Sequence, residues 1–312
     1  MCHIRVVSRV YGYDPVEGAN VTMEEREFLV EQFEEHRGRL RAVAYRMLGS
    51  LSEADDAVQE AWIRLSRTDA NAVENLGGWL TTVVARVSLN MLRSRRTRRE
   101  EPLVRLPEPI IDRADGVDPE HEALLADSVG LAMLVVLETL SPPERVAFVL
   151  HDVFGMPFDE IAPVVDRSPE AARQLASRAR RRVQGENTTS DADLGTQRRI
   201  VDAFFAAARD GDFAALLEVL DPDVVLRADL GPEVGSIELR GAEAVAGQAA
   251  AYSQIGLLVR PALINGVAGA VSTLDGELFS VGAITVRDGR IVEIDILADP
   301  ERLRQLDLKI LD

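Results

Sequence analysis

The chain has almost no cysteine, few aromatic residues and no long apolar run. Among its 312 residues Cys2 is the only cysteine, which excludes an internal disulfide, and four histidines are too few for a zinc finger or zinc redox sensor. No apolar run reaches the roughly 18–20 residues of a membrane span, and residues 1–22 lack the apolar core of a signal peptide. We therefore expect a cytoplasmic protein with no metal, no cofactor and no membrane insertion.

Lysine is nearly absent too, and the overall charge is acidic. The net charge is −17, and of 35 Lys and Arg residues only Lys309 is lysine. The arginines are concentrated in two places: residues 86–105 carry seven against two Glu, and residues 167–183 carry six against one. One such run could equally be a solvated helix end. Two runs, each closing a helical pattern, favour a nucleic acid as partner.

Hydrophobic periodicity and Pro- and Gly-rich stretches divide the chain into six segments. A strong helical pattern opens at Met23, so we expect Met1 or Met23 as the native start. The expected segments are a flexible arm (1–22), a helical domain (23–100), a linker without regular elements (101–120), a second helical domain (121–185), a second linker (186–194) and an α+β domain (195–312).

Apolar spacing predicts three helices in the first helical domain, over 24–50, 53–67 and 76–95. Ser52 is the expected N-cap of the second, with Asp55 in the capping-box position. In the second helical domain we expect a helix over 119–139 and another that starts at Ser141-Pro142-Pro143-Glu144. Two short helices, 157–165 and 168–184, have the spacing of a helix-turn-helix, with Asp166 at the turn.

The last segment changes from helical to strand-like patterns. A helix pair is expected over 195–220 and a further helix over 241–252. The expected strands are 223–228, 236–240, 257–264, 267–274, 278–286 and 290–297. Asp275-Gly276 and Asp288-Gly289 are hairpin turn pairs. These patterns predict a curved antiparallel sheet covered by helices.

Three motifs carry a resemblance to a known family. Residues 53–65 read Glu-Ala-Asp-Asp-Ala-Val-Gln-Glu-Ala-Trp-Ile-Arg-Leu, and Gly78-Trp79-Leu80 and the arginine cluster 93–99 follow. With the helix-turn-helix, this combination resembles the extracytoplasmic-function sigma factors of bacterial RNA polymerase over about 24–184. Residues 195–308 resemble the cone-shaped barrel of the SnoaL-like (NTF2-like) superfamily. The implied fold is two all-α sigma domains followed by an α+β barrel.

Sigma factors with this fused barrel form a recognisable subgroup, which includes the mycobacterial J-type factors. The linker motif of the subgroup resembles Leu106-Pro107-Glu108-Pro109, and its C-terminal motif resembles Asp299-Pro300-Glu301-Arg302-Leu303. A weaker likeness to its glycine-rich loop lies around Asp229–Gly235. Prolines keep the linker motif extended, which suits a groove. We expect the acidic barrel to pack against both sigma domains, whose DNA-binding helices are basic, and to fix their separation.

The resemblance also assigns site residues. Asp55, Asp56, Gln59 and Glu60 are expected to dock on core RNA polymerase; the alternative is a solvated acidic face. Ser88, Asn90, Arg93, Arg95 and Arg96 are expected at the minus-ten element, and loop 69–78 holds a flipped base or is an ordinary loop. The recognition helix 168–184 is expected to read the minus-thirty-five element through Ser168, Arg173, Gln174, Ser177 and Arg178, with Arg180, Arg181 and Arg182 on phosphates.

The implied function is promoter-specific transcription initiation in a stress response, with activity modulated by the barrel and no turnover. Two alternatives are a helix-turn-helix repressor or activator, and a bifunctional protein whose barrel is an enzyme or binds a ligand. Asp229, Asp275 and Asp295 are the acid/base candidates. The expected cavity residues, otherwise plain core, are Phe204, Phe205, Leu226, Tyr252, Leu263 and Phe279. Promoter DNA and core polymerase are the expected partners; an anti-sigma factor and a small-molecule ligand are left open.

Overall fold

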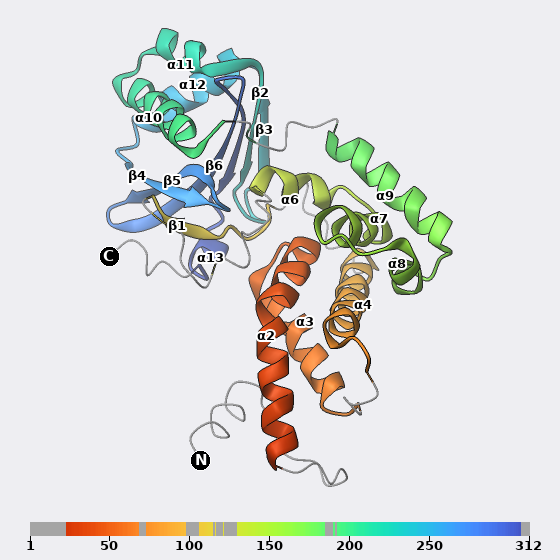
Figure 1. Cartoon of the computed structure of the whole chain (residues 1–312). Coiled ribbons are helices and arrows are strands. Elements are labelled where there is room, and N and C mark those ends of the chain that lie inside the picture. Colours follow the sequence, from red (N-terminus) through yellow and green to blue (C-terminus); the bar gives the residue numbers. More distant parts are fainter. Residues whose placement is uncertain are drawn as a thin grey trace.

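The computed structural model describes residues 23–68, 73–97, 106–114, 116, 121, 130–184, 190 and 192–306. These form a first helical domain, a second helical domain and a sheet domain, which meet around the linker strand β1 and helix α6 (Figure 1). The expected arm 1–22, the first four residues of the loop 69–78 and most of the first half of the helix expected over 119–139 lie outside the described residues. Within the described ranges, no helix combines the length and hydropathy that a membrane crossing requires.

The first helical domain contains α2 (Met23–Leu48), α3 (Leu51–Leu65) and α4 (Leu76–Thr97). Gly49 ends α2 in the left-handed conformation, with φ +67°. The N-cap of α3 is Ser50, whose hydroxyl accepts from the Glu53 amide at 3.5 Å, so the prediction of Ser52 as the cap is wrong. The helix starts earlier because Ser50 is the extended residue directly after the glycine turn.

The second helical domain contains α6 (Leu131–Glu138), α7 (Pro142–Phe148), the π-helix η2 (Val149–Val153), α8 (Phe158–Val165) and α9 (Pro169–Gln184). The predicted capping box is confirmed: Ser141 and Glu144 cap each other's backbone at the start of α7. The helix-turn-helix is confirmed as well, with Asp166 at φ +55° in its turn. Ser168 caps α9 through the Ala171 amide, at 3.3 Å.

The sheet domain is a curved seven-stranded sheet with helices on one face (Figure 1). Its elements are α10 (Leu194–Asp210), α11 (Phe213–Val219), β2 (Leu220–Asp229), β3 (Ser236–Arg240), α12 (Ala242–Ser253), β4 (Leu258–Ile264), β5 (Val267–Leu274), β6 (Glu277–Arg287), β7 (Arg290–Leu297) and α13 (Pro300–Leu303). The strand order is β1-β4-β5-β6-β7-β2-β3, antiparallel except for the β2–β7 pair. All six predicted strands are present. Both predicted hairpin turns have two successive positive φ angles, and Asn265-Gly266 makes a third that the sequence reading missed.

The seventh strand comes from the expected linker. Residues Ile111–Arg113 form β1, which pairs antiparallel with β4 so that Ile111 lies opposite Ile264. The prediction of a linker without regular elements is therefore wrong at this point. The extended chain satisfies its backbone groups on an exposed sheet edge, a form of strand addition that needs no particular side-chain pattern.

Two hydrophobic cores lie on the two faces of the sheet. The inner face, which we define as the face covered by α10, α11 and α12, has its own core. The outer face presents Val281, Ala283 and Leu297 to a core that runs without a break through both helical domains. Helix α6 of the second helical domain packs against β6 and β7 on this side. The three domains are therefore joined by apolar packing as well as by the chain.

Candidate nucleic-acid interface and interdomain contacts

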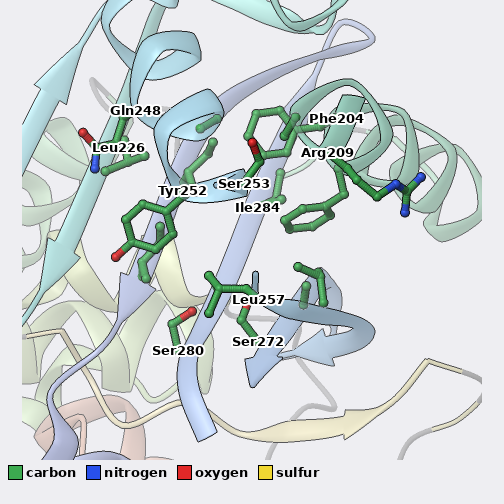
Figure 2. Close-up of a pocket in the computed structure, with 18 of the residues that line it drawn as sticks. Phe204, Arg209, Leu226, Gln248, Tyr252, Ser253, Leu257, Ser272, Ser280 and Ile284 are labelled. Atoms are coloured by element: carbon green, nitrogen blue, oxygen red, sulfur yellow. The ribbon is translucent and has the colours of Figure 1, made fainter. Parts of the chain in front are cut away.

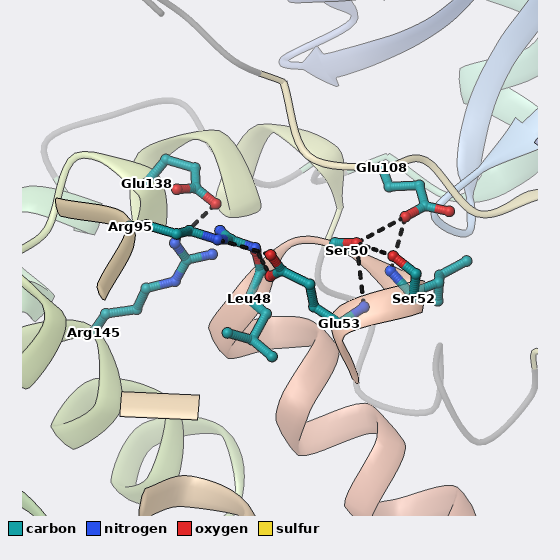
Figure 3. Close-up of polar contacts among 9 residues, drawn as sticks. Leu48, Ser50, Ser52, Glu53, Arg95, Glu108, Glu138 and Arg145 are labelled. Atoms are coloured by element: carbon teal, nitrogen blue, oxygen red, sulfur yellow. Dashed lines mark hydrogen bonds and ion pairs between the residues drawn. The ribbon is translucent and has the colours of Figure 1, made fainter. Parts of the chain in front are cut away.

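The predicted minus-ten helix α4 exposes only a narrow polar stripe. Asn90, Arg93 and Arg96 are exposed, whereas Ser88 is fully buried and out of reach of DNA in this arrangement. Arg95 forms an ion pair with Glu53 and donates to the Leu48 carbonyl at 3.0 Å (Figure 3). Its guanidinium therefore holds α4 against the start of α3. In the described structure, only the three exposed residues of the predicted set are open to a partner.

Helix α4 also contacts the second helical domain directly. It packs against α7 and α8, and Arg86 donates to the Pro163 carbonyl at 3.2 Å. Arg93 lies 3.6 Å from Asp166, the left-handed residue of the helix-turn-helix. The two units predicted to bind DNA therefore touch each other. We call this the closed arrangement.

The recognition helix α9 is packed on one face and exposed on the other. Ala172, Ala176, Ala179 and Val183 are buried. The exposed side chains include the predicted readout residues Arg173, Gln174, Ser177 and Arg178 and two of the predicted phosphate-contact arginines, Arg181 and Arg182. The predicted readout face is therefore accessible even in the closed arrangement.

Ion pairs also fix α9 to the rest of its domain. Arg180 contacts Asp152 at 2.6 Å, while Arg178 and Arg182 lie 3.6 and 3.7 Å from Glu144. Burial alone would raise the pKa of Glu144, but hydrogen bonds from Ser141, with the two arginines, lower it. Glu144 thus stays charged where it supports the helix.

The predicted docking helix α3 exposes its acids next to arginines of its own domain. Asp55 accepts from Arg41 at 2.7 and 3.2 Å, and Glu60 pairs with Arg64 at 2.9 Å. Asp56 is exposed. Gln59 is half-buried. Such partly exposed ion pairs are weak, so a stronger basic partner can replace them.

The linker motif 106–109 is held against the first helical domain by Glu108 (Figure 3). The Glu108 carboxylate accepts from the Leu51 amide at 2.9 Å and from the Ser50 hydroxyl at 3.2 Å. The Glu108 amide donates to the Gly49 carbonyl at 2.8 Å. A carboxylate at the first turn of α3 is favourable because free amides and the helix dipole are positive there.

The opposite side of this segment is held by the sheet domain. The Ile110 amide donates to the side-chain carbonyl of Asn265 at 3.1 Å. The backbone amide of Asn265 donates to the Ile110 carbonyl at 2.8 Å. Asn265 also donates to the Tyr45 hydroxyl at 2.8 Å, and that hydroxyl donates to the Glu108 carbonyl at 2.6 Å. Neither residue was singled out from the sequence, although the Asn265-Gly266 turn signal was visible.

The C-terminal motif 299–303 contacts the linker motif. Arg302 donates to the Asp229 carboxylate and to the Leu106 carbonyl, both at 2.5 Å. Asp229 also accepts from the Leu106 amide at 3.1 Å. Asp299 caps α13 and packs beside Gly231. The segments resembling the three subgroup motifs therefore lie together in one buried cluster.

Gly49 is where the linker and both helical domains come closest. A Cβ at this position would lie 2.8 Å from the Glu138 carboxylate and 3.3 Å from Pro107. Glu138 pairs with the fully buried Arg145 at 2.8 Å (Figure 3). The glycine is therefore needed both for its positive φ and for the close approach.

The sheet domain contains a cavity of about 610 Å³ under α10 and α12. Phe204, Phe205, Leu226 and Tyr252 line it as predicted, whereas Leu263 and Phe279 do not. The acid/base candidates lie elsewhere: Asp229 joins the interdomain cluster, Asp275 occupies a hairpin turn, and the buried Asp295 lies beside Arg227. None of the three is among the described residues that line the cavity.

Sequence comparison decides the family. The profile of Sigma-70 region 2 matches residues 32–98, and that of Sigma-70, region 4 matches residues 131–183. The chain is 37% identical to the ECF RNA polymerase sigma factor SigJ of Mycobacterium tuberculosis, over 90% of this chain and 95% of that protein. The chain belongs to the extracytoplasmic-function sigma factor family.

Two further matches agree with this assignment. The sigma factor is 34% identical to the probable ECF RNA polymerase sigma factor SigI of M. tuberculosis, over 87% of this chain and 93% of that one. The crystal structure of M. tuberculosis SigJ superposes with a TM-score of 0.71, covering 90% of this chain and all of that one. The sigma factor therefore binds core RNA polymerase and promoter DNA and directs transcription initiation through its region 2 and region 4 domains.

Proposed function

We propose that this cytoplasmic sigma factor uses three surfaces during initiation and has no turnover of its own. The proposed polymerase surface is Asp55, Asp56, Gln59 and Glu60 on α3. The proposed minus-ten surface is Asn90, Arg93 and Arg96 on α4, with the loop 69–78, and Arg95 positions this helix against α3. The proposed minus-thirty-five surface is Ser168, Arg173, Gln174, Ser177, Arg178 and Arg181 around α9. The exposed, basic face of α9 supports the last assignment.

We further propose that the sheet domain controls the sigma factor by holding the closed arrangement. The supporting observation is that two domains form hydrogen bonds to the linker segment. Tyr45 and Leu51 bind it from the first helical domain, and Asn265 and Arg302 bind it from the sheet domain. The proposed regulatory residues are Leu106–Pro109 and Asp299–Leu303. The domain boundaries that we propose are those predicted above, except that β1 belongs to the sheet.

The closed arrangement opposes promoter binding by both domains together. The two promoter elements, about 25 base pairs apart by their names, lie roughly 85 Å apart on B-DNA at about 3.4 Å per base pair. In the closed arrangement Arg93 of α4 lies 3.6 Å from Asp166 of the helix-turn-helix. The α9 helix, with 16 residues, is only about 24 Å long at about 1.5 Å per residue. Binding both elements therefore requires the helical domains to separate.

The test is to weaken the binding of the linker motif to the sheet domain without changing a proposed DNA-binding residue. In Arg302→Ala the Asp229 carboxylate and the Leu106 carbonyl lose a donor. Arg304→Ala is the matched control, because Arg304 is exposed and, within the described part of the chain, its side chain bonds only to the Pro300 carbonyl of its own turn. We expect the Arg302 variant alone to show a larger radius of gyration in X-ray scattering. We also expect more run-off transcript with limiting sigma factor, since about 1.4 kcal/mol of lost docking is a tenfold shift toward the open state.

Two results would contradict these proposals separately. If Arg302→Ala matches Arg304→Ala in both measurements, the sheet domain does not control the spacing. If neither the unmodified chain nor Arg302→Ala gives run-off transcript with core polymerase on any promoter selected by sequencing bound DNA, the three proposed surfaces are not used as assigned.

A further inference from the structure

The cavity on the inner face of the sheet is large and mostly apolar. Its volume of about 610 Å³ lies within the range of about 300–1,000 Å³ for small-molecule sites. Phe204 and Phe205 come from α10 and Tyr252 from α12, while the strands contribute mainly aliphatic side chains (Figure 2). A cavity lined this way favours an apolar occupant over water.

Polar side chains interrupt the apolar lining in two places: Gln248, Tyr252 and Ser253 on α12, and Ser272 and Ser280 on the strands. Ser272 on β5 and Ser280 on β6 lie directly opposite each other in the strand pair, and both line the cavity (Figure 2). Both residues are largely buried, with 8% and 6% exposure. Within the described part of the chain, neither hydroxyl has a hydrogen-bond partner in the protein. Buried hydroxyl groups normally have a hydrogen-bond partner, so this pair can form hydrogen bonds to a polar atom of a ligand.

The mouth of the cavity is apolar as well. Ile237 and Leu258 line the cavity and are 38% and 55% exposed, so aliphatic side chains lie where the cavity meets solvent. The charged residues in the described lining are Asp202 and Arg209, which are both exposed on α10. Arg209 lies 3.8 Å from Asp210. No buried charge in this lining would compensate an ionic ligand for lost hydration.

We propose that the cavity binds a neutral, largely apolar small molecule with one hydroxyl or carbonyl group, which bonds to Ser272 and Ser280. The ring faces of Phe204 and Phe205 would cover its apolar part.

The strands that line the cavity also carry the interdomain contacts. In β6, Gly282 and Ile284 face the cavity, while Val281 and Ala283 join the core shared with the helical domains. A ligand that changes the curvature of β6 would therefore change how α6 packs on the outer face. This consequence rests on the proposed control by the sheet domain, whereas the binding site itself does not.

The first test uses the neutral fluorophore N-phenyl-1-naphthylamine, titrated into the full chain without polymerase. Gly282→Leu should fill the cavity, because a Cβ at this position would meet its nearest atoms at 3.9 Å and would thus fit without a clash. Gly247→Leu is the matched control, since nothing lies within 4 Å of that exposed site on α12. We expect saturable binding to the unmodified chain and the control, and at least tenfold weaker binding to Gly282→Leu.

The second test measures the hydroxyl pair by displacement of the fluorophore. We expect 1-naphthol to compete roughly 2- to 10-fold better than naphthalene, as one hydrogen bond would give, and 1-naphthoate to compete worst. In Ser272→Ala/Ser280→Ala the preference for 1-naphthol should vanish while naphthalene still competes, which also shows that the variant is folded. Equal fluorophore binding by Gly282→Leu and the unmodified chain, or an undiminished naphthol preference in the serine variant, would overturn the proposal. Neither titration depends on the outcome of the Arg302 experiment.

Discussion

The side-chain amide of Asn265 donates to the hydroxyl of Tyr45 at 2.8 Å, across 220 positions of the chain. The same hydroxyl donates a hydrogen bond to the Glu108 carbonyl. One phenol thus joins α2, the linker motif and the β4–β5 turn. Burial raises the pKa of Tyr45 well above its usual value, so the hydroxyl stays a neutral donor at any physiological pH.

Tyr45→Phe should therefore lower the free energy of unfolding by about 1–3 kcal/mol, because it leaves buried polar groups of Asn265 and Glu108 without a partner. The measurement is urea denaturation. Tyr252→Phe is the control, since that hydroxyl belongs to the cavity region and not to the domain junction. Equal midpoints for the two variants would show that the Tyr45 hydroxyl does not join the domains.

Gly49→Ala should destabilise the protein more than Gly155→Ala does. Both glycines have nearly the same positive φ, +67° and +69°, so both variants carry a similar backbone cost of about 1 kcal/mol. Only at Gly49 does the added Cβ meet Glu138 and Pro107, whereas nothing lies within 4 Å at Gly155. The difference between the two urea midpoints measures the interdomain contact alone. No difference would mean that the contact adjusts freely.

Stability should fall as the pH rises from about 4 to about 7. Burial raises the pKa of Asp295 to about 7, although the Arg227 guanidinium at 3.5 Å favours the charged form. Arg227 also forms ion pairs with Glu293 and Glu238, so these carboxylates already balance its positive charge and it stabilises a charged Asp295 less. In the unfolded chain an aspartate has a pKa of about 3.9. Because the folded state binds the proton more tightly, deprotonation costs folding free energy on the order of 2–3 kcal/mol between pH 5 and 8.

Asp295→Asn should flatten this slope and should be more stable than the unmodified chain at pH 8. Asp275→Asn is the control: it changes the same atoms in an exposed turn, where Asn also tolerates the left-handed conformation. Urea denaturation at pH 5, 6, 7 and 8 measures both. An unchanged slope in Asp295→Asn would assign the dependence to another group.

Reversing Asp56 and Glu60 to Arg should weaken binding to core polymerase at least tenfold. The free energy of unfolding, measured by urea denaturation, should change by no more than about 0.5 kcal/mol, since exposed changes usually affect stability little. Glu243→Arg, an exposed reversal in the sheet domain, should bind normally. Co-purification with core polymerase is the measurement. Full retention of the α3 variant would place the docking surface elsewhere.

Arg173→Ala and Arg181→Ala should fail in different ways. Arg173 lies at the start of α9 over the Phe158 ring, so its loss should cost about 1–3 kcal/mol at one base pair and relax the preference there. Arg181, near the end of α9, should weaken all promoters similarly and reduce the salt slope by about one unit. Gel-shift titrations on promoter variants at several salt concentrations separate the two. Identical behaviour would overturn the assignment.

The elements that short-range chemistry determines were predictable from the sequence. The Ser141–Glu144 capping box, the left-handed Asp166 and the Asp-Gly hairpins all depend on neighbouring residues. The start of α3 was missed because Ser50 and Ser52 are equally good caps, and only the glycine turn decides between them.

The missed parts depend on distant residues. Strand β1 is too short for a period and forms only because β4 offers an edge. A fully buried Ser88, the Arg95–Glu53 pair and the Tyr45–Asn265 bond follow from tertiary contacts that no local pattern encodes. The direct contact between α4 and the helix-turn-helix belongs to the same class.

The pairing of β1 with β4 also sets how far the sigma factor can stretch. From Thr97 to Gly130 the free chain could span about 110 Å at about 3.4 Å per residue. With Leu106–Arg113 held at the sheet domain, only about 30 Å of chain, from Thr97 to Leu106, joins the first helical domain to that fixed segment. On the other side, Gln184 is tied to Leu194 by about 35 Å of chain. Even after the helical domains part, the end of α4 and the end of α9 therefore each stay within about 35 Å of their attachment points on the sheet domain, which limits how far apart the two can move.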